Sequence, residues 1–174
     1  MAGHIFILGI GNILMRDDGA GPRVIHQLQE EWNGEAGVFL LDGGTLAFTL
    51  LPTLCACPAL IVVDAARLGL EPGAIGRFEG EAMDAYLRSG KHSAHEVGIA
   101  DLLDMARLLN ALPTRRVLIA IQAIDDSFGE VLSIPVAQAI PRAAAAVREI
   151  VNQWRRDSIC LCEEIPYDRP IHIG

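Results

Sequence analysis

Strongly apolar runs alternate with amphipathic segments along most of the chain. Four runs predict strands: "HIFILGI", "GVFLLDGG", "PALIVVDA" and "RRVLIAIQA". The first is typical of a strand that is covered on both faces of a sheet, the second is short, the third is expected to be central and the fourth buried. A shorter segment, "GAIGRFEG", predicts a strand at the edge of the same sheet. The apolar pattern therefore predicts one sheet that is largely buried.

The segments between these runs place apolar residues at helical spacing. "GPRVIHQLQEEW" predicts a helix with Pro22 in its first turn, and "HEVGIADLLDMARLLNAL" predicts a second helix. "TLAFTLLPTL" predicts a short helix with Pro52 near its end. "IPVAQAIPRAAAAVREIVNQWRRD" predicts a long final helix that is kinked or restarted at Pro141. We therefore expect an α/β fold, a three-layer sandwich in which a twisted, mostly parallel sheet lies between helices on both faces.

The length of 174 residues favours a single α/β domain, which we place at residues 1–157. The remaining segment 158–174, "SICLCEEIPYDRPIHIG", has poor periodicity and two prolines, so we expect an extended or disordered tail. The opening "MAGHIFILGIGN" lacks a cationic start, and its apolar run is too short to span a bilayer. These features favour a cytoplasmic protein without a membrane partner.

Charge and cysteine content narrow the partners further. The formal net charge is −8 and no run of Lys or Arg occurs, which disfavours nucleic acid as a partner. The four cysteines form two C-x-C pairs, Cys55 with Cys57 and Cys160 with Cys162. In a reducing compartment we expect thiols. A structural zinc site remains an alternative, although such sites more often use C-x-x-C spacing.

Acidic residues lie at the ends of three of the four buried runs, where sites form in open α/β sheets. The first run leads to Asp17 and Asp18, the second ends at Asp42, and the third ends near Asp64. A site rich in carboxylates suits a metal ion, an acid pair that shares a proton, or a basic substrate. Nucleotide binding is disfavoured because "GIGNIL" has Leu14 where the dinucleotide motif needs its third glycine, and no P-loop motif occurs.

The segment "HSAHEVG" adds a histidine to this set. Ser93 and Glu96 fit a capping box, which places His95 in the first turn of a helix. A helix N-terminus disfavours imidazolium, so His95 is expected to be neutral and able to bind a metal. The alternative is that His95 only caps the helix or packs against its neighbours. Gly98 either lets another group come close to the helix backbone or allows tight packing of the helix on the sheet. His92 precedes the N-cap and is expected to point elsewhere. The remaining histidines are interpreted as surface or core residues: His4, His26 and His172.

Together, "GIGNILMRDDGAG", "LDGGT", "IVVDA" and "HSAHEVG", in this order and spacing, resemble the maturation endopeptidases of nickel–iron hydrogenases. The resemblance covers about residues 4–125. It implies one cut in the hydrogenase large-subunit precursor, which removes a C-terminal extension after nickel insertion. It also implies that Asp18, Asp64 and His95 bind nickel or a surrogate cation, and that Asp42 lies near the scissile segment. Asp18 stands where many relatives have Glu, and Ala94 stands where many have Pro or Thr.

The chain lacks the motifs of the common hydrolases. No H-E-x-x-H or G-x-S-x-G occurs, which disfavours a resident zinc with its own glutamate base and a serine nucleophile. We therefore expect nickel to be supplied by the substrate, with no organic cofactor. Either the metal polarises the scissile carbonyl or an acid activates water. A non-catalytic nickel-binding or metal-delivery module with the same residues is the alternative function.

Overall fold

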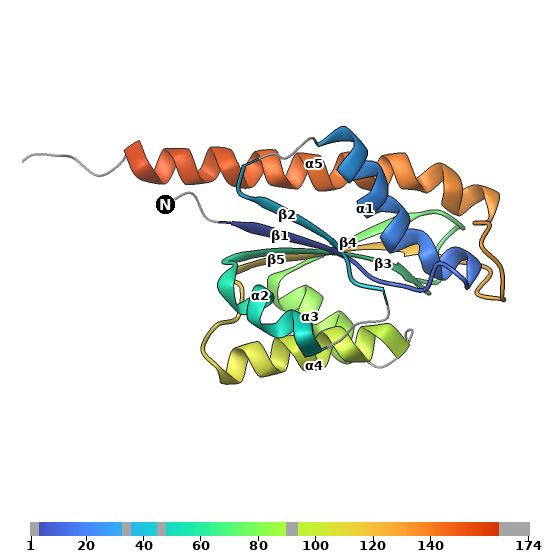
Figure 1. Ribbon diagram of the computed structural model, residues 1–174, viewed down its shortest axis with the longest axis horizontal. Helices are drawn as coiled ribbons and strands as arrows, with labels where there is room; N and C mark the ends of the chain where they lie inside the picture. The colour runs from blue at the N-terminus through green and yellow to red at the C-terminus, as the bar shows by residue number, and fades with distance from the viewer. Residues whose placement is uncertain (1–3, 33–35, 45–47, 90–93, 164–174) are drawn as a thin grey trace, which may run out of the picture.

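The computed structural model of the protein describes residues 4–32, 36–44, 48–89 and 94–163 (Figure 1). One five-stranded sheet has the order β2-β1-β3-β5-β4. Four strands are parallel, and the edge strand β4 pairs antiparallel with β5. The strands are β1 (Ile5–Gly9), β2 (Val38–Asp42), β3 (Ala59–Ala66), β4 (Ile75–Glu79) and β5 (Arg115–Gln122).

Helices cover both faces of this sheet, as the sequence predicts. α1 and α5 lie on one face, and α2, α3 and α4 lie on the other (Figure 1). The helices are α1 (Ala20–Glu31), α2 (Leu51–Ala56), α3 (Gly80–Arg88), α4 (Ala94–Leu108) and α5 (Ile134–Glu163), with short 3-10 turns η1 (Arg16–Gly19) and η2 (Phe48–Leu50). The predicted α/β three-layer arrangement is thus confirmed.

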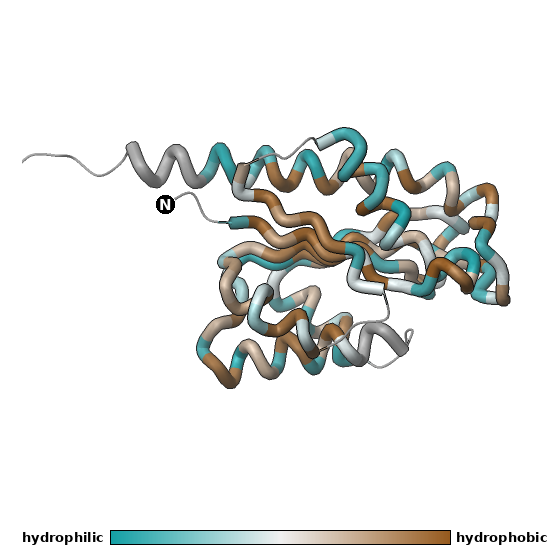
Figure 2. The backbone as a smooth tube through the Cα atoms, in the orientation of Figure 1, coloured by the Kyte–Doolittle hydropathy of each residue, from teal (hydrophilic) through white to brown (hydrophobic). Residues whose placement is uncertain are grey.

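Alternate residues of the buried strands feed two separate cores. In β3, Ile61 and Val63 join the core beneath α1 and α5, whereas Leu60 and Val62 join the core beneath α2, α3 and α4. All four side chains are fully buried, and each contributes about 2 kcal/mol through its removal from water. The strands are accordingly the most continuously hydrophobic part of the chain (Figure 2).

Several elements differ from the sequence prediction. Pro52 lies at the start of α2 rather than near its end, where its missing N–H and fixed φ cost little. α3 was not predicted. α5 runs without interruption through Pro141 and continues to Glu163. Its last residues therefore fall within the segment for which an extended or disordered tail was expected, and that expectation is wrong for 158–163. The helix can continue there because the sequence has no proline or glycine between residue 158 and Pro166. Residues 164–174 lie outside the described part.

The strand order has a switch point at the carboxyl ends of β1 and β3, and we call this place the crevice. The chain leaves β1 toward β2 on one side, while β3 lies on the other side of β1. Such a point, where neighbouring connections diverge, is where ligands bind in open α/β sheets. The loop after β1 carries Asp18 and β3 carries Asp64, so both acids belong to this crevice.

Candidate functional site

The glycines after β1 serve close packing of the loop on the sheet. Gly11 has φ +133°, and a Cβ there would lie 1.8 Å from the carbonyl oxygen of Asp18. A Cβ on Gly21 would lie 2.2 Å from the carbonyl oxygen of Ile10 and 2.5 Å from that of Val63. Only glycine permits these approaches. The motif therefore brings the start of α1 down onto β1 and β3 and places Asp18 beside the crevice.

Asp18 is held by the start of its own loop. Its Oδ2 accepts a hydrogen bond of 2.7 Å from the backbone N–H of Asn12. The Asn12 side chain in turn accepts one of 3.0 Å from the backbone N–H of Leu14. Asp18 is half-buried. The carboxylate thus has a defined orientation and remains accessible.

Asp64 is the most unusual group in the described structure. It is fully buried in β3, and neither carboxylate oxygen has a hydrogen-bond partner among the described residues. Burial raises the pKa of Asp64 well above its ordinary value, and the negative charge of Asp18 raises it further. The backbone N–H of Ala65 opposes both effects without forming a hydrogen bond of normal geometry. The structure therefore brings Asp64 and Asp18 into electrostatic contact.

A buried carboxylate without donors fits a bound cation. Burying an ionised carboxylate is costly unless a proton or a positive charge compensates it. Oxygen ligands and an imidazole suit nickel and zinc alike. Asp64 and Asp18 can thus supply two oxygen ligands from neighbouring strand ends.

Tyr86 of α3 is a neighbour of Asp64 that sequence reasoning missed. Burial raises the pKa of Tyr86 to about 12, with a further contribution from the charge of Asp64. The ring stacks on Phe78, with centroids 4.2 Å apart. Because α3 was not predicted, nothing in the sequence placed this hydroxyl near the site; the apolar spacing of Met83 and Leu87 was the available signal.

Asp42 contacts α1 rather than Asp18 or Asp64 in the described interactions. Its Oδ1 accepts a 2.9 Å hydrogen bond from the backbone N–H of Gly44, and its Oδ2 lies 3.2 Å from Nε2 of His26. His26, interpreted from the sequence as a surface or core residue, is about half exposed and is an ion-pair partner of Asp42 when protonated. The register places Asp42 beside Gly9, at the same sheet edge as the two other acids.

Asp17 has a different role from its neighbour Asp18. It is fully buried, and its carboxylate accepts hydrogen bonds from the backbone N–H groups of Ile124, Asp125 and Ser133 and from the Ser133 hydroxyl. Every donor comes from the segment between β5 and α5. Asp17 therefore ties the loop that carries Asp18 to this distant segment.

The third proposed ligand, His95, is the second residue of α4, so its predicted place in a first helical turn is confirmed. Its side chain lies outside the described part, as do the residues 90–93 that include His92 and Ser93. Among the described side chains, no group of three or more His, Cys, Asp or Glu is placed to hold a metal ion. The complete triad therefore stays a prediction.

The cysteines take no part in the described site. Cys55 and Cys57 are free thiols at the end of α2, and burial raises the pKa of the Cys57 thiol. Cys160 and Cys162 fall in the last part of α5, where side chains are not described. None of the described helices is long and apolar enough to cross a membrane.

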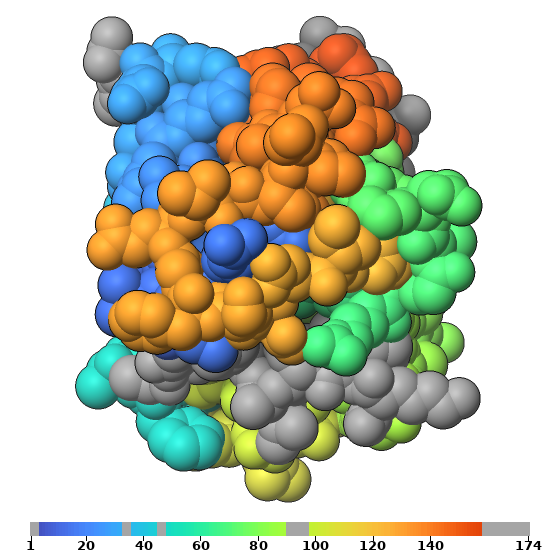
Figure 3. Space-filling model, turned by 90° about the vertical axis from the view of Figure 1, so that its right-hand side faces the viewer, coloured from blue at the N-terminus to red at the C-terminus, as the bar shows by residue number. Residues whose placement is uncertain are grey.

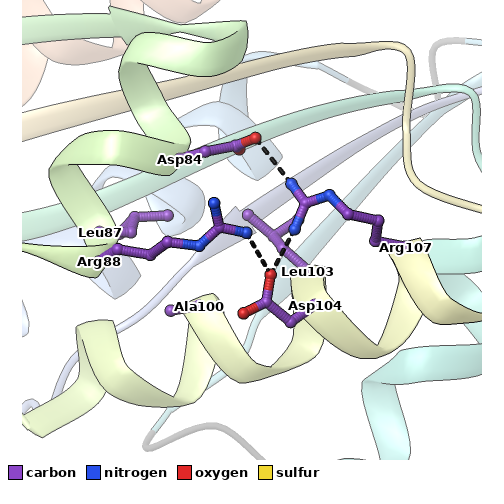
Figure 4. A pocket seen from close by; sticks show the side chains of 7 residues that line it. All are labelled: Asp84, Leu87, Arg88, Ala100, Leu103, Asp104 and Arg107. Carbon is purple, nitrogen blue, oxygen red and sulfur yellow. Dashed lines mark hydrogen bonds and ion pairs between the residues drawn. The ribbon is translucent and has the colours of Figure 1, made fainter.

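A second acidic cluster lies away from the crevice, between α3 and α4 (Figure 4). Asp84 accepts hydrogen bonds from Arg116 and Arg107, and Asp104 pairs with Arg107 and Arg88. Asp84, Asp104, Arg88 and Arg107 line a pocket together with Leu87, Ala100 and Leu103. Each described carboxylate here already has cationic partners, so this cluster stabilises the helix packing.

The face at the carboxyl ends of the parallel strands is shown in Figure 3. The segment after β5 (amber to orange) lies across the middle and encloses part of the early loop (blue). The segment between β3 and β4 (green) lies beside them. The crevice is therefore bordered by three loops that come from distant parts of the chain.

Comparison with known proteins agrees with this arrangement. The family model of the HycI hydrogenase maturation protease matches residues 22–150. The chain belongs to the hydrogenase maturation protease family. This protease is 33% identical over 171 residues to the hydrogenase expression/formation protein HupD of Thiocapsa roseopersicina, which covers 94% of this chain and 77% of the relative.

Solved structures show the same fold for this maturation protease. The hydrogenase maturating endopeptidase HybD from E. coli superposes with a TM-score of 0.80 at 27% identity, over 86% of this chain and 93% of that one. The [NiFe] hydrogenase maturation protease HybD from Thermococcus kodakarensis gives a TM-score of 0.73 at 29% identity, over 84% and 98%. The family and the fold expected from the sequence motifs are both confirmed.

Proposed function

We propose that this protease removes the C-terminal extension of a nickel–iron hydrogenase large-subunit precursor after nickel has been inserted. The substrate's nickel is recognised by Asp18, Asp64 and His95, and the reaction takes place in the cytoplasm. The observation that carries the proposal is the carboxylate of Asp64, fully buried and without hydrogen-bond donors in the described structure, beside Asp18 in a chain of this family.

The two acids explain how the presence of a metal could be recognised. Without a cation, burial and the charge of Asp18 favour the protonated form of Asp64. A divalent cation in the crevice favours the ionised form instead, because it supplies the missing compensation. A nickel-loaded precursor is therefore bound more tightly than an empty one. His95, at the start of α4, is the third ligand in this proposal.

Binding energy from that contact places the precursor chain in the crevice. Hydrolysis adds water across the scissile peptide bond, so that the carbonyl carbon gains a hydroxyl and the leaving nitrogen gains a proton. Holding the peptide and the attacking water in register contributes several kcal/mol in favourable cases. Asp42, oriented by Gly44 and His26, lies at the same ends of the strands, and in this proposal it is the carboxylate beside the scissile segment.

The test uses protease that has been stripped of metal by a chelator. We expect stripped protease to shorten a nickel-loaded precursor, as seen by mass and gel mobility, and to leave a nickel-free precursor intact. Adding nickel or zinc to the protease alone should not rescue the nickel-free precursor. If stripped protease is inactive on the loaded precursor and zinc restores it, the metal belongs to the protease, and recognition of substrate nickel is refuted.

A further inference from the structure

Two segments beside the crevice expose large apolar side chains, namely the loop after β1 and the stretch from the end of β5 to the first residue of α5. Phe128 is 80% exposed, Val131 and Ile134 are each 74% exposed, and Ile124 is 56% exposed. In the loop after β1, Ile13 and Leu14 are each 43% exposed. We call these six side chains the apolar rim. They are six of the twelve large apolar side chains that are exposed among the described residues, and such a concentration in two joined segments is typical of an interaction site.

The backbone beneath the apolar rim is held by hydrogen bonds between the two loops. The backbone N–H of Gly129 donates to the carbonyl of Leu14 at 2.8 Å, and that of Arg16 donates to the carbonyl of Gly129 at 2.7 Å. The N–H of Asp17 donates to the carbonyl of Asp125 at 3.0 Å. Together with the buried Asp17 carboxylate, these bonds hold the rim in place before any partner binds. Pre-organisation of this kind lowers the entropy cost of association.

Four charged residues next to the apolar rim are paired within the protein, whereas Glu130, which is exposed between Phe128 and Val131, adds one negative charge. Arg16 lies 2.9 Å from Asp125, and Arg67 pairs with Asp126. When a partner covers this surface, these four charges keep their ion-pair partners, so binding avoids the free-energy cost of burying an unpaired charge. A partner with an apolar contact surface is the best match, whereas a strongly charged partner finds no uncompensated charge on these four residues.

The position of the apolar rim identifies its occupant. Asp18 and the rim residues Ile13 and Leu14 belong to one loop, and that loop is bonded to the segment carrying the other four. A specific protein interface covers about 800 Å² of each partner, far more than two carboxylates at a strand end provide. A folded precursor that brings its cleavage site to Asp64 therefore also covers the neighbouring loops.

We infer that the apolar rim is the docking surface for the folded body of the large-subunit precursor, through an apolar patch next to its nickel site. This inference rests on the proposed function. Phe128 is the main anchor, because it is the most exposed rim residue and an aromatic side chain contributes the largest contact area. The rim determines how tightly the precursor binds, and the crevice acids determine whether it is cut.

The experiment compares two double variants of the full-length protease. F128S with V131S removes the centre of the apolar rim. The matched control is L108S with L109S, which removes two side chains that are 83% and 61% exposed. They lie near the end of α4, on the side of the sheet where the parallel strands begin (Figure 1). Both pairs are exposed, so both variants should fold, as checked by circular dichroism and thermal unfolding. Cleavage of nickel-loaded precursor is measured over a range of precursor concentrations.

We expect the rim variant to raise KM by about tenfold or more with a much smaller change in kcat, whereas the control behaves like wild type. Size-exclusion chromatography of the protease alone should give the same oligomeric state for all three proteins. If wild type cuts the precursor and the rim variant has the KM of the control, the docking surface is refuted while the protease function stands. A dimer that only the rim variant loses would assign the rim to self-association and overturn the inference. Wild-type protease that leaves every precursor uncut would instead refute the proposed function.

Discussion

Two buried aspartates of this protein, Asp64 in the crevice and Asp84 in the α3–α4 cluster, have opposite surroundings. Asp84 is 8% exposed and accepts a two-pronged hydrogen bond from Arg116, at 2.8 and 2.7 Å, and a third bond of 2.8 Å from Arg107. Burial alone would raise its pKa, but the Arg116 hydrogen bonds and the charges of Arg116, Arg107 and Arg88 outweigh burial and lower the pKa. Asp64 has no such donors in the described structure, and its pKa is raised.

The comparison shows that burial by itself does not separate structural acids from functional ones. Asp17 is as deeply buried as Asp64, yet four donors satisfy it, so it belongs with Asp84. The hydrogen bonds of Asp17 and Asp84 stabilise the fold. Asp64 has no hydrogen-bond partner of normal geometry among the described residues, so the cost of its burial is offset elsewhere in the structure or by a bound cation.

Replacing aspartate with asparagine should have opposite effects at Asp64 and Asp84: D64N should lose cleavage but not stability, and D84N should lose stability but not cleavage. The largest effect is expected on cleavage by D64N. D64N should abolish cleavage of nickel-loaded precursor, because an amide is a weak metal ligand and carries no charge. Its free energy of unfolding at neutral pH should not fall, because a carboxyl group whose pKa is raised by folding disfavours the folded state above its unfolded pKa. Both are measured by the cleavage assay and by urea unfolding. A D64N protease that cuts at the wild-type rate would remove Asp64 from the site.

D84N should leave a protease that still cuts but is less stable. The substitution removes the charge that compensates Arg116, whose side chain is only 10% exposed, and leaves a nearly buried cation. Breaking a buried pair in this way costs about 3 kcal/mol, to be measured by urea unfolding at neutral pH. Cleavage per folded molecule should stay near wild type. Full loss of cleavage in a folded D84N protein would contradict the division between the two regions.

The acid dependence of stability tests the Asp84 pairing further. Because its pKa is lowered in the folded protein, the ionised carboxylate contributes stability above its unfolded value of about 3.9. That contribution is lost as the pH falls through the lower, folded value. D84N should therefore lose less stability than wild type between neutral pH and about pH 3. Equal slopes for the two proteins would mean that the arginines do not stabilise the charge of Asp84.

D17N should have a smaller effect on stability and a partial effect on cleavage. Both carboxylate oxygens of Asp17 accept bonds from backbone N–H groups, so one of them would have to face the amide NH₂ of the new Asn. The expected loss is about 2 kcal/mol in unfolding free energy, with slower cleavage because the Asp18 loop is less well anchored. S133A, which removes only the hydroxyl donor, is the matched control and should lose about 1 kcal/mol. If D17N cuts normally, the anchoring of the loop is unimportant for the site.

Replacing all four cysteines with serine should have the smallest effect. Cys57 is buried and hydroxyl burial is mildly unfavourable, so a loss of about 1 kcal/mol in stability is expected. Cleavage should be unchanged, because Asp18 and Asp64 need no thiolate. A folded quadruple variant that cannot cut would revive a zinc or thiol role for the C-x-C pairs.

The sequence predicts the sheet well because its buried strands are long, apolar and bounded by turns. It does not predict α3, since "GEAMDAYLR" begins with glycine and its apolar stripe of Met83 and Leu87 is short. Motif reasoning places Asp18 and Asp64 at one edge of the sheet, and the structure confirms that. Without the resemblance to a family, the residue pattern does not distinguish Asp17 from Asp18, because the donors to Asp17 lie more than 100 positions away. The contact of His26 with Asp42 is hidden for the same reason, since it depends on how α1 packs beside β2.

The long reach of the Asp17 hydrogen bonds also has a consequence for the order of events during synthesis. The Asp17 carboxylate accepts hydrogen bonds from backbone N–H groups that are 107, 108 and 116 positions further along the chain, so these bonds form only after those residues have been made. The loop carrying Asp18 can therefore reach its final conformation only after β5 has joined the sheet and Ser133 has emerged from the ribosome, by which time more than three quarters of the 174 residues have been made. The loop with the first two aspartates of the chain is therefore among the last parts of the molecule to reach its folded conformation, so a partly synthesised chain does not yet hold Asp18 beside Asp64.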